Sequence, residues 1–78
     1  MAAKGNYIEL GDRIYSYDTL LVEPLPDYGF IGNITKYSAT TSKHQSKARV
    51  KYCRIMIGDV PTGCSSLVAL AKERGFLK

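Results

Sequence analysis

The sequence has little of what metal sites and membrane spans need. It contains no tryptophan, one histidine (His44) and two cysteines, Cys53 and Cys64, which do not form a C-x-x-C pair. Cysteine and histidine alone therefore cannot complete a structural zinc site. No apolar run approaches the roughly 20 residues that a membrane-spanning helix needs. We expect no metal, no cofactor and no contact with a membrane, and we expect both cysteines to be reduced, partly buried thiols.

Acidic residues are missing from the middle of the chain. Residues 28–58 carry six cations and no acid, a net charge of +6, whereas residues 1–27 carry five acids and two cations, a net charge of −3. Such a field can steer the protein towards nucleic acid or an acidic protein surface. The alternative, which the sequence leaves open, is a solvated face partly neutralised by the acidic segment. The six cations are Lys36, Lys43, Lys47, Arg49, Lys51 and Arg54.

The length of the chain allows one domain. Seventy-eight residues, of which 45% are hydrophobic, are ordinary for a single small globule over residues 1–78. We expect residues 1–5 to be a flexible N-terminus. Domains of this size are often stabilised by oligomerisation, so self-association is a further hypothesis.

The pattern of apolar and turn-forming residues predicts an α+β fold. Its sheet is expected to be small and antiparallel, with three to four strands, packed with two short helices. The compact apolar run Leu20-Leu21-Val22 is typical of a strand buried on both faces. Strands are expected near residues 6–10, 13–17, 20–22 and 30–37.

The first helix is expected from about residue 42 to residue 49. Ser42-x-x-Gln45 fits a capping box, in which the two side chains satisfy free backbone N–H groups. Ser38 and Thr40 are alternative caps. Residues 50–57 are interpreted as a strand that ends before Gly58, with continued helix as the alternative.

The second helix is expected over residues 65–74. Leu67, Val68, Leu70 and Ala71 form an apolar stripe at helical spacing, and Gly75 is suited to a left-handed C-terminal stop.

The run Tyr37-Ser38-x-Thr40-Thr41-Ser42-Lys43-His44-Gln45 resembles a Y-S-x-T-T-S-[KR]-H-Q motif of small uncharacterised proteins encoded by tailed bacteriophages. Residues 16–20 and 59–63 are also similar to that group. The resemblance implies a phage origin and a compact α+β accessory protein. We expect the protein to be located in the cytoplasm of the host cell. It implies no substrate.

Catalysis is not expected, because paired carboxylates at catalytic spacing, a nucleophile elbow and a metal-ligand cluster are missing from the sequence. His44 could act as a general base, but a structural hydrogen-bonding role is the more common one for such a histidine. The hydroxyls before it could receive an anion at the helix N-terminus, or simply cap that helix. The candidate binding surface consists of Tyr37, Lys43, His44, Lys47, Arg49, Lys51 and Arg54.

The function expected from these features is that of a non-enzymatic accessory protein that binds a host or phage protein. Inhibition of a host defence system would be one such role. The alternative is a nucleic-acid-binding module that uses the basic segment 43–54 against phosphates.

Overall fold

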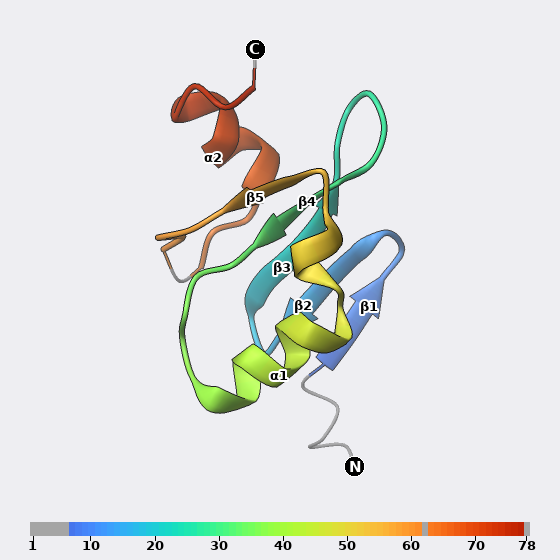
Figure 1. Cartoon of the computed structure of the whole chain (residues 1–78), viewed down its shortest axis with the longest axis vertical. Coiled ribbons are helices and arrows are strands. Elements are labelled where there is room, and N and C mark those ends of the chain that lie inside the picture. The colour runs from blue at the N-terminus through green and yellow to red at the C-terminus, as the bar shows by residue number, and fades with distance from the viewer. Residues whose placement is uncertain (1–6, 62, 78) are drawn as a thin grey trace.

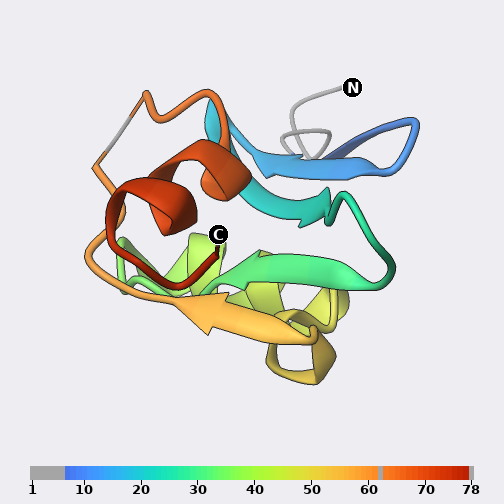
Figure 2. The same ribbon diagram turned by 90° about the horizontal axis from the view of Figure 1, so that it is seen from above.

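The computed structural model describes residues 7–61 and 63–77, which form a five-stranded sheet with helices on both faces (Figures 1 and 2). The expected flexible segment 1–5 lies outside the described residues. The strands follow the order β1-β2-β3-β4-β5 across the sheet. Their bounds are β1 Tyr7–Leu10, β2 Arg13–Ser16, β3 Thr19–Pro24, β4 Phe30–Asn33 and β5 Ile55–Ile57.

The α+β prediction is confirmed, with two differences in the sheet. The sheet has five strands, whereas three to four were expected. The first three strand pairs are antiparallel, but β4 and β5 run parallel. A parallel pair needs a crossover connection. Here the crossover carries α1 (Ala39–Lys47) and the 3₁₀ helix η2 (Val50–Tyr52) across one face, whereas α2 (Leu67–Glu73) covers the other (Figure 2). In the part of the chain that the structure describes, neither α-helix has the length and apolarity to cross a bilayer.

A β-bulge explains why the run Leu20-Leu21-Val22 is buried throughout. Ile14 is opposite Val22 and Tyr15 is opposite Leu20, so Leu21 is the extra residue in β3. The bulge breaks the alternation of side chains. Leu20 therefore joins the core under α2, while Leu21 and Val22 both pack against Val50 of η2. Burial on both faces, predicted from the composition of this run, is confirmed.

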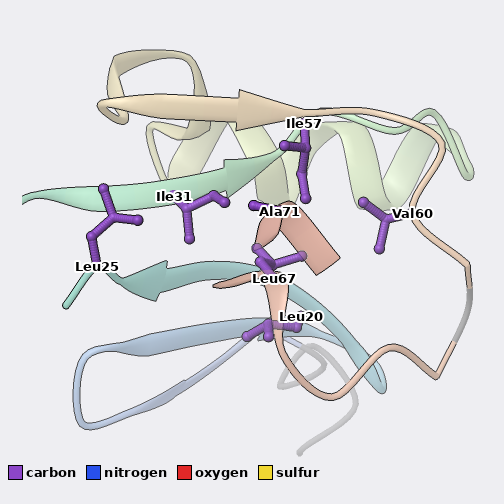
Figure 3. Close-up of a cluster of buried hydrophobic side chains, with 7 residues drawn as sticks. All are labelled: Leu20, Leu25, Ile31, Ile57, Val60, Leu67 and Ala71. Carbon is purple, nitrogen blue, oxygen red and sulfur yellow. The ribbon is translucent and has the colours of Figure 1, made fainter. Parts of the chain in front are cut away.

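The larger core lies between the sheet and α2 (Figure 3). Leu67 and Ala71 of α2 are fully buried, and Val68 and Leu70 pack beside them. The predicted apolar stripe is therefore the buried face of this helix, which begins after the N-cap Ser66. The strands contribute Leu20, Ile31 and Ile57, and loops contribute Leu25 and Val60.

The first helix begins at one of the alternative caps, and the preferred start at Ser42 is wrong. Its N-cap is Ser38, whose Oγ accepts a hydrogen bond from the Thr41 N–H at 3.2 Å. Ser42 already lies inside the helix, and the Gln45 side chain does not return to the helix start. Gln45 Nε2 donates instead to the carbonyls of Asn33 and Thr35, at 2.7 and 2.9 Å. This side chain ties α1 to the segment that leaves β4.

The end of that helix also differs from both alternatives considered for residues 50–57. Arg49 adopts a left-handed backbone conformation (φ 59°), which ends α1 and turns the chain into η2. The predicted strand exists and ends before Gly58, but it begins at Ile55 and not at residue 50, and the alternative of a continued helix is wrong. The reason is tertiary: η2 must pack its Val50 onto the sheet before the chain can enter β5.

Replacement of Ser38 by alanine should lower the free energy of unfolding by about 1 kcal/mol, because the Thr41 N–H loses its acceptor. Ser42→Ala is the matched control and should change stability by less than about 0.5 kcal/mol, since Ser42 is exposed within the helix. Urea unfolding followed by circular dichroism would measure both. An equal loss in the two variants would argue against Ser38 as the cap.

Candidate interaction surface

The structure does not gather the predicted binding residues on one surface. Two of them, His44 and Tyr37, are half-buried and make internal hydrogen bonds. The predicted cations lie on different parts of the surface. Lys47 lies over the Tyr7 ring, Lys51 lies in a hollow beside α1, and Arg49 and Arg54 lie in another hollow. The exposed cations are Lys43, Lys47, Arg49, Lys51 and Arg54.

His44 joins α1 to the sheet. Its Nδ1 is within hydrogen-bonding distance of Ser16 Oγ in β2, and Ser16 Oγ also donates to Thr41 Oγ1 at 3.3 Å. A Ser–His pair can form a nucleophile in enzymes. Ser16, however, is fully buried, so no substrate reaches its hydroxyl. The pair therefore serves to hold α1 against β2.

Two tyrosines flank His44 on its outer side. The ring centroids of Tyr7 and Tyr17 lie 5.5 and 6.1 Å from that of His44, and Lys47 Nζ lies 4.3 Å from the Tyr7 centroid. Burial, followed by the hydrogen bond to Glu9, raises the pKa of Tyr7. Tyr7 therefore stays neutral, and Lys47 contacts a neutral aromatic face.

Tyr37 links two segments that are distant in sequence. Its hydroxyl donates to the Val60 carbonyl at 2.7 Å and accepts from Asn33 Nδ2 at 3.1 Å. Sequence reasoning assigned this residue to the binding surface. The structure uses its hydroxyl to fasten the crossover to the loop before α2.

The first of two exposed surfaces is a hollow beside α1, which we call the lysine hollow. It has a volume of about 240 Å³, and it holds two lysines, Lys36 and Lys51, with two apolar residues, Ile34 and Val50. Ile34 is 48% exposed, whereas Val50 is buried. Polar side chains of α1 complete the lining: Ser42, Gln45 and Ser46.

The second surface is formed by two adjoining hollows of about 260 and 340 Å³ that share Phe30 and Ala48. We call it the split-charge groove. Glu9 and Asp12 of the β1–β2 hairpin line one end, and Arg49 and Arg54 line the other.

Aromatic rings stand beside the basic end of the groove. The Arg54 guanidinium carbon lies 4.3 Å from the Tyr28 centroid, and Tyr28 is 69% exposed. Tyr52 lines the same end.

Cys53 also lies at the basic end of the groove, and burial raises the pKa of its thiol. This thiol is therefore a weak nucleophile at neutral pH.

Sequence reasoning missed one buried acid, Glu23. Only 3% of its surface is exposed, and its Oε1 accepts the Val68 N–H of α2 at 2.8 Å. Ser66 donates to the same carboxylate, and Arg13 forms an ion pair with it at 3.3 Å. No sequence signal identifies this site, because the partners lie far apart along the chain.

Among residues 7–61 and 63–77, no three His, Cys, Asp or Glu side chains gather as a metal ion would require.

Comparison with known proteins identifies a family. Residues 2–56 of the chain match the model of a family of unknown function, DUF8033. The matched range contains every residue that lines the lysine hollow and the split-charge groove, whereas α2 follows it. No curated protein and no solved structure matches the chain.

Proposed function

The chain belongs to the DUF8033 family, and we propose that it is a non-enzymatic protein that binds an acidic protein surface through the lysine hollow. The observation that carries this proposal is the position of Ile34. This apolar side chain is 48% exposed and lies in one hollow with two lysines, Lys36 and Lys51. Protein interfaces are built in the same way, with an apolar centre inside a polar rim.

Charge supports an acidic partner. The hollow is lined only by residues 34–51, which lie inside the acid-free segment 28–58. Two lysines at its rim would attract an acidic surface and orient it, while burial of Ile34 would supply the apolar contribution to affinity.

Tyr52 lines the basic end of the split-charge groove and stands next to Lys51 of the lysine hollow. It is 76% exposed, and Lys51 Nζ lies 5.9 Å from its ring centroid. Tyrosine is among the residues that most often contribute binding energy at protein interfaces. An exposed tyrosine beside the hollow therefore favours a protein partner.

A role without catalysis is consistent with the way the histidine is used. His44 pairs with a fully buried serine, and this contact holds a helix in place. Following the resemblance to phage proteins, we propose that the partner is a host or phage protein in the host cytoplasm. Inhibition of a host defence system would be one consequence of such binding.

The proposal predicts that charge reversal in the hollow abolishes partner binding. A Lys36→Glu/Lys51→Glu variant should lose at least about tenfold in affinity, because two attractive contacts become repulsive. The measurement is capture of one discrete protein from nuclease-treated bacterial lysate, followed by titration of that protein. Lys72→Glu is the matched control, since it reverses an exposed lysine on α2, across the sheet from the hollow.

Two outcomes would contradict the proposal. One is equal capture of the same protein by the double variant and the wild type. The other is tight binding to generic DNA or RNA that falls steeply with salt, which would favour the nucleic-acid module instead.

A further inference from the structure

We propose that the split-charge groove is the interface of a two-fold symmetric dimer of this chain. This inference concerns a surface different from the lysine hollow. The groove has an apolar floor, formed by Ile14, Val22, Phe30 and Ala48. Phe30 is 40% exposed. An apolar floor of this kind gains free energy when a partner removes it from water.

The two ends of the groove carry opposite charges. Glu9 and Asp12 lie at the hairpin end, and Arg49 and Arg54 lie at the η2 end, with Phe30 and Ala48 between them. A purely acidic or purely basic partner would match one end and be repelled by the other. A second copy turned by a two-fold rotation about Phe30 matches both, because each acidic end then meets the basic end of the other copy.

Another feature of the chain supports self-association through this groove. Tyr28, whose ring lies beside Arg54 at the basic end, is 69% exposed. Pairing of two grooves would cover this side chain.

The test uses charge exchange between copies. Asp12→Lys alone places a cation against Arg54 of the other copy at both ends of the dimer, and Arg54→Glu alone places an acid against Asp12. The homodimer of each variant should have a dissociation constant at least about tenfold higher than that of the wild-type dimer. An equimolar mixture restores an attractive pair at both ends, so it should form a heterodimer with a dissociation constant within about threefold of the wild-type value.

Sedimentation velocity over a range of concentrations, at low and high salt, would measure these constants. Wild-type association should weaken with salt. Glu73→Lys on α2 makes the same charge change as Asp12→Lys on an exposed position of another surface, and it should leave the dimer intact. Thermal melts of the variants would confirm that each is folded.

Several results would overturn the dimer. These are a monomeric wild type at every concentration, single variants that remain dimeric, a mixture that stays monomeric, or an open-ended series of larger assemblies. The lysine hollow does not include Asp12 or Arg54, so capture of an acidic partner by these variants is expected to persist. Failure of the dimer is thus distinguishable from failure of the proposed function.

Discussion

Replacing Gly32 by valine should detach η2 from the sheet and lower the free energy of unfolding by about 3 kcal/mol. A Cβ atom at Gly32 would lie 2.8 Å from Val50 Cγ1, 2.9 Å from the Val50 carbonyl oxygen and 3.0 Å from Cys53 Sγ. These distances are too short for real contacts, and one of the atoms belongs to the backbone of η2. The chain therefore cannot relieve the clash by rotating a side chain. Either η2 moves away from β4 or the strand itself is displaced.

Cys53 provides a specific readout for this prediction. Burial raises the pKa of its thiol, so the fraction present as thiolate at pH 8 is below that of an exposed cysteine. Release of η2 would expose the thiol, return its pKa towards the ordinary value and increase its rate of alkylation. The rate, measured in a Cys64→Ser background, should therefore rise in Gly32→Val.

Gly58→Ala is the control for the loss of a glycine at a position where an added side chain causes no clash. A Cβ at Gly58 would meet only Ile34 Cγ1, at 3.9 Å, an ordinary contact. This variant should unfold at nearly the wild-type urea concentration and keep Cys53 protected. If Gly32→Val behaves in the same way, the close packing of η2 on β4 is not required for the fold.

Because Val50 and Lys51 line the lysine hollow while Arg49 lines the groove, loss of η2 packing should also weaken binding at both proposed surfaces.

The sequence predicted those parts of the fold that depend on local pattern. The α2 stripe and the doubly buried run in β3 follow from the spacing of apolar residues, and the structure confirms both. The start of α1 was less well determined because Ser38 and Ser42 have the same capping chemistry. The choice between them depends on where the chain leaves β4, which is a tertiary feature.

Long-range packing accounts for what the sequence did not predict. The parallel pairing of β4 with β5 depends on a crossover whose path is fixed by contact between Val50 and Gly32. The separation of Lys51 from Arg49 and Arg54 has the same origin, because the left-handed turn at Arg49 and the following η2 place Lys51 in the lysine hollow and the two arginines in the groove. A count of charges along the chain contains no information about that turn. Glu23 was missed for a related reason, since its partners Arg13, Ser66 and Val68 lie far apart along the chain.

Asn33→Leu should lower the free energy of unfolding by about 3 kcal/mol, although the side chains are similar in size. Asn33 is fully buried at the end of β4. Its Nδ2 donates to the Leu20 carbonyl at 3.0 Å, and its Oδ1 accepts the Thr35 N–H at 2.9 Å. Leucine can do neither, so a buried carbonyl and a backbone N–H would each lose a partner. Urea unfolding would measure the loss.

Tyr37→Phe provides a graded comparison within the same network. It removes only the hydroxyl between Asn33 and Val60, so its cost should be smaller, about 1 kcal/mol. The double variant should lose less than the sum of the two single losses, because the residues share a hydrogen bond. Strict additivity, or an Asn33→Leu variant as stable as wild type, would show that the network does not hold the crossover.

Since this network positions the segment that contains Ile34 and Lys36, Asn33→Leu should also reduce binding at the lysine hollow under conditions in which the protein is still folded.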